Sequence, residues 1–120
     1  MSSDQPDSIF HITTPEAWAA AAEAGQYVHP SLENEGFIHM STSDELLATT
    51  RRHYEGVSGL IVLEIDPDQL TEGTLVWEMA PSVGREFPHS YGPIPTDAVT
   101  ATHGWDADEN GLRQLPISRP

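Results

Sequence analysis

The sequence contains no cysteine and no lysine. Without cysteine the chain can form no disulfide bond, no thiolate nucleophile and no cysteine-based zinc site. Its five basic residues are all arginine and face 19 acidic ones, which gives a formal net charge of -14. Such a charge leaves no polybasic surface for a nucleic-acid backbone and opposes docking on anionic membranes. General nucleic-acid binding and membrane docking are therefore not expected, and the partner expected from the candidate site residues is a small molecule.

Long apolar runs are also missing, since none approaches the roughly 20 residues that a membrane-spanning helix needs. Residues 1–7 lack the positive start and the apolar stretch of a secretory signal, which predicts a cytoplasmic location and a disordered N-terminal segment. The length of 120 residues, 38% of them hydrophobic, suits one core. We therefore predict one domain over residues 8–103, followed by a C-terminal hairpin or tail over residues 104–120, because Asn110 and Gly111 suit a tight turn.

Two helices are predicted from their end signals. Thr13, Thr14, Pro15 and Glu16 combine a capping box with a first-turn proline and start a helix that Gly25 is placed to end. Thr42 and Glu45 form a second capping box, which predicts a helix to about Tyr54. The sequence therefore predicts two short helices.

Strands are predicted where short apolar or alternating segments lie between turn residues. These segments are residues 8–13, 37–40, 60–66, 74–79, 98–103 and, after the expected hairpin turn, 112–117. Residues 80–97 are rich in proline and glycine, which predicts a long irregular loop. Strands and helices together indicate an α+β domain.

Titratable residues recur on the predicted strands. Side chains alternate along a strand, so His11, His39 and Glu78 each oppose apolar neighbours. If these faces line one cleft, two imidazoles and a carboxylate converge, and imidazole suits proton transfer near neutral pH. The alternative is that each is an ordinary buried or exposed strand residue.

The loop around His89 combines aromatic, proline and glycine residues. A lid over residues 81–95 is expected to bring His89 toward His11 and His39, with Phe87 or Tyr91 anchored in the core. The alternative is a plug that only fills the core.

These residues carry a resemblance to a known family. The runs Ile9 to Ile12, Glu35 to His39 with Ser41, Trp77 with Glu78, and Phe87 to Gly92 resemble the bacterial domain-of-unknown-function family nine-five-two, over about residues 9 to 102. That family is similar in turn to the RNA 2'-phosphotransferases and other ADP-ribosyltransferase-like proteins. The resemblance implies a curved, split, mainly antiparallel sheet with NAD, the expected cofactor, in its cleft.

The same resemblance implies roles for individual residues. His11 is expected to contact the nicotinamide ribose, His39 and Ser41 to shape the nicotinamide pocket, and Glu78 to assist an oxocarbenium-like transition state. With His89 these form the predicted catalytic group, and Tyr27, Arg52 and Tyr91 join Ser41 as predicted cofactor-binding residues. The phosphotransferases hold RNA with several arginines that this chain lacks, so activity on RNA is not expected.

Three functional classes remain open. The first is a transferase or hydrolase that binds NAD or another ADP-ribosyl compound. The second is a ligand-binding or structural module without catalysis. The third is a zinc site of His11, His39, His89 and Glu78, although nothing in their spacing resembles a zinc motif and no metal is expected.

Overall fold

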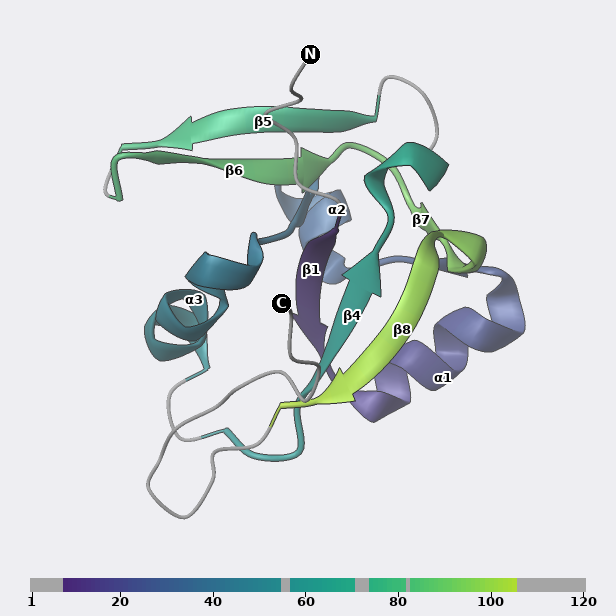
Figure 1. The fold of residues 1–120 in the computed structure, drawn as a ribbon. Coiled ribbons are helices and arrows are strands. Elements are labelled where there is room, and N and C mark those ends of the chain that lie inside the picture. The colour runs from purple at the N-terminus through teal and green to yellow at the C-terminus, as the bar shows by residue number, and fades with distance from the viewer. Residues whose placement is uncertain (1–7, 55–56, 71–73, 82, 106–120) are drawn as a thin grey trace.

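Antiparallel strands form the framework of the computed structural model, which describes residues 8–54, 57–70, 74–81 and 83–105 (Figure 1). In the first sheet β4 (Ile61–Ile65) lies between β1 (Ile9–Thr13) and β8 (Val99–Gly104). In the second sheet β6 (Arg85–Ser90) lies between β3 (Ile38–His39) and β5 (Leu75–Ala80). A short pair joins β2 (Gln26–Tyr27) to β7 (Ile94–Pro95). With its helices, this framework confirms the predicted single α+β domain of mainly antiparallel strands.

The two larger sheets meet at Phe10 and Ser41. The Phe10 amide donates to the Ser41 carbonyl at 2.8 Å, and the Ser41 amide donates to the Phe10 carbonyl at 2.7 Å. This contact holds β1 beside the end of β3. It thereby brings His11 and His39 together, although they lie 28 positions apart in the chain.

Helix α1 (Pro15–Ala24) begins and ends where its capping residues predict. The Thr14 hydroxyl accepts a hydrogen bond from the Ala17 amide at 3.2 Å, and Gly25 ends the helix at a φ of 85°. That left-handed backbone favours glycine, which has no Cβ to clash. Ala21 and Trp18 pack this helix against the core.

Helix α3 (Leu46–His53) begins differently from the prediction. A 3₁₀ turn (Ser43–Glu45) precedes it, and Thr42 makes no side-chain capping bond. The Thr42 hydroxyl instead donates to the Asp44 carboxylate at 2.5 Å, while Glu45 forms an ion pair with Arg85. The predicted capping box is therefore wrong, because both of its side chains have other partners.

Helix α2 (Pro30–Asn34) was not predicted. Its first turn is capped by imidazole, because Nδ1 of His29 accepts a hydrogen bond from the Ser31 amide at 3.0 Å. The described residues thus form three α-helices rather than two, with further 3₁₀ turns at Pro67–Gln69 and Thr96–Ala98.

The prediction of an irregular loop over residues 80–97 is wrong. Strand β6 pairs with β5 over six residues, from Leu75 with Ser90 to Ala80 with Arg85, and β7 pairs with β2. Phe87 is buried as expected of an anchor, whereas Tyr91 is 43% exposed. Residues 85–90 are therefore the central strand of a sheet and not part of a lid.

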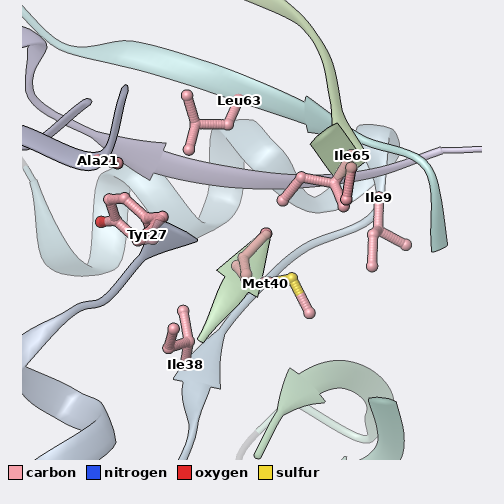
Figure 2. Packing of buried hydrophobic residues seen from close by; sticks show 9 residues of the cluster. Ile9, Ala21, Tyr27, Ile38, Met40, Leu63 and Ile65 are labelled. Carbon is pink, nitrogen blue, oxygen red and sulfur yellow. The ribbon is translucent and has the colours of Figure 1, made fainter. Parts of the chain in front are cut away.

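Two groups of buried apolar side chains form the core. The larger contains Tyr27, Ile38, Leu63 and Ile65, which come from β2, β3 and β4 (Figure 2). The smaller lies beside α3 and contains Phe10, Ile12, Leu46, Leu60, Val62 and Trp105. Strand β1 contributes to both groups, which explains why all five of its residues are buried.

The predicted domain ends at residue 103, but the fold extends slightly further. Gly104 belongs to β8 and Trp105 is buried, so both are integral to the fold. The expected disordered segment 1–7 and the hairpin over residues 106–120 lie outside the described residues. No helix in the described part of the chain is long and apolar enough to cross a membrane.

Candidate functional site

A cavity of about 460 Å³ is bounded by β1, β3, α3, the β5–β6 hairpin and the segment around α2. This volume lies within the range of small-ligand pockets, about 300 to 1,000 Å³. Its lining includes one arginine, Arg52, and one carboxylate, Glu35. It also includes five of the six histidines of the chain: His11, His29, His39, His53 and His89. Imidazole is thus the dominant polar group of the cavity.

His11 lies in the inner wall, with both ring nitrogens hydrogen-bonded. Nδ1 lies 2.6 Å from the His39 carbonyl oxygen, and Nε2 lies 2.8 Å from the Tyr27 hydroxyl. A carbonyl can only accept, so Nδ1 carries the proton and donates. In the neutral ring Nε2 then accepts from Tyr27, whose oxygen accepts in turn from the Thr13 hydroxyl at 2.9 Å.

Burial determines the charge of this pair. Desolvation of the buried imidazole lowers the pKa of His11 to about 4, although its hydrogen bond to the His39 backbone opposes the shift. Burial also raises the pKa of Tyr27 to about 12. Both groups are therefore neutral near pH 7, and neither ring nitrogen of His11 remains available to a ligand.

His39 and His89 face each other across two paired strands. They are directly opposite in the register of β3 and β6, and their ring centroids lie 5.3 Å apart in an edge-to-face arrangement. His39 is half exposed, and its Nε2 pairs with Glu35 at 3.0 Å. The ring of Phe37 stacks on His89, with centroids 4.2 Å apart and planes 14° from parallel.

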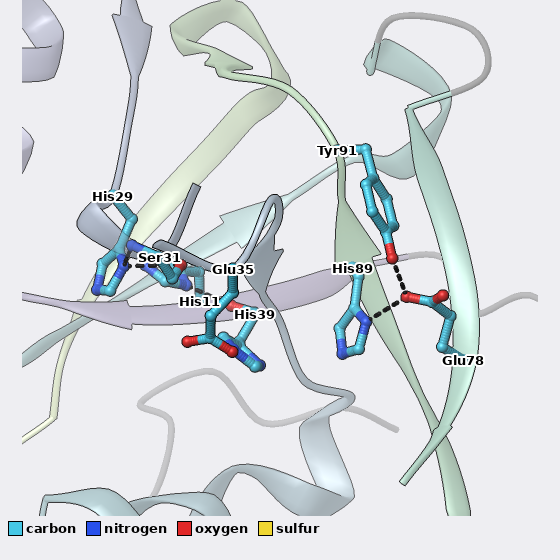
Figure 3. Close-up of polar contacts among 8 residues, drawn as sticks. All are labelled: His11, His29, Ser31, Glu35, His39, Glu78, His89 and Tyr91. Carbon is cyan, nitrogen blue, oxygen red and sulfur yellow. Dashed lines mark hydrogen bonds and ion pairs between the residues drawn. The ribbon is translucent and has the colours of Figure 1, made fainter. Parts of the chain in front are cut away.

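Glu78 connects His89 to Tyr91. One oxygen of its carboxylate lies 2.7 Å from Nδ1 of His89 and accepts a hydrogen bond from the Tyr91 hydroxyl at 2.7 Å (Figure 3). The Tyr91 hydrogen bond, followed by that of His89, lowers the pKa of Glu78, so the carboxylate is ionised near pH 7. Because Nδ1 donates to a carboxylate, the neutral His89 ring has an unprotonated Nε2.

Arg52 supplies the cationic group of the cavity wall. Its guanidinium carbon lies 5.8 Å from the centroid of the Phe87 ring, and one of its nitrogens donates to the Thr49 hydroxyl at 3.3 Å. The same Thr49 oxygen lies 3.2 Å from the Ser41 hydroxyl. Within the described residues Arg52 makes no ion pair with a carboxylate, whereas Arg85 pairs with Asp44 and Glu45.

The structure brings most of the predicted site residues to this cavity. We predicted that His11 and His39 lie on neighbouring strands with their rings facing one cleft. The Phe10–Ser41 contact places β1 beside the end of β3, and both histidines line the cavity. The predicted residues that line the cavity are His11, His39, Ser41, Arg52 and His89. Those outside its lining are Tyr27, Glu78 and Tyr91, each hydrogen-bonded to a lining histidine or its partner.

Other residues of the site were missed. Glu35, the residue that follows α2, pairs with His39 of β3 four positions on, and that helix was not predicted. His29 could have been found from its place before Pro30, since proline is common in the first turn of a helix. His53 and the stacking of Phe37 on His89 carry no sequence signal, because tertiary packing alone creates them.

The proposed zinc set is not assembled. No three His, Asp or Glu side chains in the described part of the chain are arranged to hold a metal ion. Both nitrogens of His11 are already hydrogen-bonded, and Glu78 is directed to Nδ1 of His89. The geometry thus offers no support for this alternative.

The fold and the histidine-lined cavity define a small α+β domain with a candidate ligand site. The chain belongs to the protein family of unknown function DUF952, whose family model matches residues 12–102. The crystal structure of protein CC0527 from Caulobacter crescentus is similar, with 30% identity and a TM-score of 0.78 over 89% of this chain and 93% of that one. The solution NMR structure of CC0527 gives 29% identity and a TM-score of 0.75 over 91% and 93%. No curated protein matches the chain.

Proposed function

We propose that this domain binds an ADP-ribosyl compound, with NAD as the representative ligand, and that it does so in the histidine-lined cavity. The observation that carries the proposal is the guanidinium of Arg52 at a cavity that also gathers five histidines. The chain as a whole has a net charge of -14, so the arginine in the cavity lining is a distinctive feature that an anionic ligand could use. The cytoplasmic location that the sequence predicts is consistent with such a ligand.

Arg52 is the residue suited to the pyrophosphate. A guanidinium presents several N–H donors in a plane, which matches phosphate oxygens in pairs. Only Thr49 takes a hydrogen bond from it among the described residues, which leaves donors for a ligand. The flanking Ser41 and Thr49 hydroxyls supply neutral hydrogen-bonding groups for a ribose or a phosphate.

The aromatic groups are suited to the planar end of the ligand. Phe87 is buried beneath Arg52, and the imidazoles of His39 and His89 lie edge to face at the β3–β6 end of the cavity. Flat apolar and imidazole surfaces favour a stacked heterocycle such as nicotinamide or adenine. The volume of about 460 Å³ lies in the range of small-ligand pockets, so we expect the cavity to take one end of NAD.

Calorimetric titration with NAD tests this proposal, with Arg52→Gln as the variant. Loss of charge-assisted hydrogen bonds to phosphate costs about 1.5 to 3 kcal/mol, so we expect affinity to fall by about 10-fold to 100-fold. Arg51→Gln is the matched control, since Arg51 is the adjacent arginine on α3 and does not line the cavity. The affinity of Arg51→Gln for NAD is expected to stay within about twofold of that of the parent protein.

The outcomes of the titration separate specific binding from charge alone. Equal losses in Arg51→Gln and Arg52→Gln would indicate general electrostatic attraction and contradict the site. A ligand with a micromolar dissociation constant, present at about 100 times that concentration, raises the free energy of unfolding by about 2.7 kcal/mol. If NAD and ADP-ribose both leave the melting temperature unchanged at such concentrations, the ADP-ribosyl proposal is wrong.

A further inference from the structure

The carboxylate of Glu78 fixes the tautomer of His89. Its 2.7 Å contact is with Nδ1, so the proton of the neutral ring lies on that nitrogen and Nε2 carries a lone pair. Nε2 makes no hydrogen bond within the described residues, and His89 lines the cavity. Figure 3 shows this second nitrogen on the side of the ring that faces away from Glu78.

Two neighbours keep this arrangement in place. The Tyr91 hydroxyl donates to the same Glu78 oxygen that pairs with His89, which orients the carboxylate from its other side. The ring of Phe37 lies flat against His89, so the imidazole is held in one plane. The side chain of His89 is only 14% exposed, whereas that of Glu78 is 39% exposed.

The hydrogen bonds of the two cavity histidines leave their ring nitrogens in different states. Glu78 holds Nδ1 of His89, so Nε2 keeps its lone pair as a hydrogen-bond acceptor. His11 offers the opposite environment, because its two nitrogens are satisfied and burial disfavours its charged form. Of these two cavity histidines, only His89 is arranged to accept a proton.

We propose that His89 is the catalytic base of the cavity, with Glu78 and Tyr91 as its positioning residues, in the hydrolysis of the bound ADP-ribosyl compound at its ribosyl C1. This step rests on the proposed function, since it requires NAD in the cavity. Nε2 of His89 takes a proton from a water molecule, whose oxygen forms the bond to C1. The bond from C1 to the nicotinamide nitrogen breaks, and its electron pair leaves with neutral nicotinamide. The products are ADP-ribose, nicotinamide and the proton held by His89.

This proposal differs from the role that the superfamily resemblance implies for Glu78. There the carboxylate acts on the ribosyl group itself. In this structure Glu78 lies outside the cavity lining and contacts His89 and Tyr91. Glu78 is therefore a positioning residue that acts through His89.

The experiment measures nicotinamide release and NAD affinity in parallel. Removing a general base typically costs 10²-fold to 10⁴-fold in rate, so His89→Asn is expected to lose about that much turnover at NAD concentrations that saturate each protein. Glu78→Ala is expected to lose about 10-fold to 100-fold, as for other residues that orient a reactive group. Glu86→Ala is the matched control, since Glu86 is an exposed carboxylate on β6 away from the cavity.

NMR of the two ring nitrogens of His89, recorded without ligand, shows which nitrogen carries the proton. This tautomer is expected to change in a Glu78 variant only if Glu78 positions the His89 ring. We expect the proton on Nδ1 in the parent, and a mixture of the two tautomers in Glu78→Ala. An Nε2–H tautomer in the parent overturns the proposal. So does unchanged nicotinamide release in His89→Asn, or NAD binding to the parent without release. Absence of NAD binding instead overturns the proposed function itself, and the hydrolysis with it.

Discussion

His11 shows how a histidine beside a cavity can be a support rather than a ligand group. Its ring joins three backbone segments, because Nδ1 donates to the His39 carbonyl and Nε2 accepts from Tyr27, which also contacts Thr13. No buried side-chain polar atom among the described residues lacks a hydrogen-bond partner. This series of hydrogen bonds, from Thr13 through Tyr27 and His11 to the His39 carbonyl, thus fixes β3 relative to β1 and stabilises the cavity wall.

The first prediction follows from the pKa of His11, which falls from 6.5 when exposed to about 4 in the fold. The unfolded chain binds the proton more tightly, so the free energy of unfolding is unaffected well above pH 6.5 and decreases as the pH falls from 6.5 toward 4. Between pH 7 and pH 5 the loss from this group is about 2 kcal/mol. Urea denaturation at both pH values measures it.

His11→Asn is the variant for this test, because asparagine keeps a donor near the His39 carbonyl but does not titrate. Its overall stability is expected to be lower at pH 7, with a stability that changes less between pH 7 and pH 5. A pH dependence identical to that of the parent would show that His11 does not carry the effect. His29 and His39, which also affect the pKa of His11, are present in both proteins, so the difference between the two pH profiles reports His11.

At this scale the sequence predicts positions better than roles. The pattern of apolar residues correctly placed His11 and His39 on strands. It could not distinguish them chemically, because the difference comes from Tyr27 and from a backbone carbonyl that tertiary contacts bring to His11. The contact between Glu78 and His89 was also missed, because His89 had been assigned to a loop and lies on β6.

Among the secondary-structure elements, β6 shows why a proline can mislead. Proline lacks the N–H that a central strand needs, so Pro88 indicates a loop. The pairing of β6 with β3 is only two residues long, His39 with His89 and Ile38 with Ser90, and Pro88 lies just outside it. Its carbonyl still accepts from the Met40 amide at 3.0 Å. The missing donor therefore falls at the end of the ladder.

Local signals were sufficient for α1 and insufficient for α2. Thr14 and Gly25 cap α1 through contacts within three or four residues, which sequence patterns record directly. Helix α2 has five residues and a histidine cap, and histidine is not among the usual capping residues. Elements with unconventional caps depend on their surroundings, so the segment before β3 was read as a plain connection.

A second prediction concerns how α3 is attached to the first sheet. Trp105 follows β8, is 3% exposed, and its indole donates to the Thr50 hydroxyl at 2.8 Å. Trp105→Ala is expected to lower the free energy of unfolding by about 3 to 5 kcal/mol, as for other large-to-small core changes. Because α3 carries Arg52, the loosened helix should also weaken NAD binding. Urea denaturation and NAD titration measure the two effects.

The control for Trp105 is Val28→Ala, since Val28 is 55% exposed. Exposed substitutions of this kind usually change stability by less than about 0.5 kcal/mol. A Trp105→Ala protein as stable as this control would mean that the indole does not hold α3 against the sheet.

For the molecule as a whole, the net charge follows directly from the composition, whereas the sequence predicts the architecture only in outline. Composition alone established the acidic character, and periodicity established an α+β domain. The residue pattern alone did not indicate a division into separate small sheets, which depends on contacts between distant residues such as Phe10 and Ser41; only the family resemblance implied a split sheet. The clustering of five histidines around one cavity follows from that division, since no stretch of sequence contains them together.

The last prediction concerns the excess of negative charge. Like charges across the surface repel one another in the folded state and destabilise it. Raising sodium chloride from about 10 mM to about 100 mM shortens the screening length from about 30 Å to about 10 Å, which weakens this repulsion. Few attractions are lost in exchange, because the arginine–carboxylate pairs among the described residues are those of Arg85 with Asp44 and Glu45.

We therefore expect salt to stabilise this protein. A gain of about 1 kcal/mol corresponds to a rise of about 4 °C in melting temperature for a domain of this size. Thermal melts across the salt series measure it, and potassium chloride in place of sodium chloride controls for binding of a specific cation. A melting temperature that falls with salt would mean that screened attractions outweigh the repulsion of the excess carboxylates.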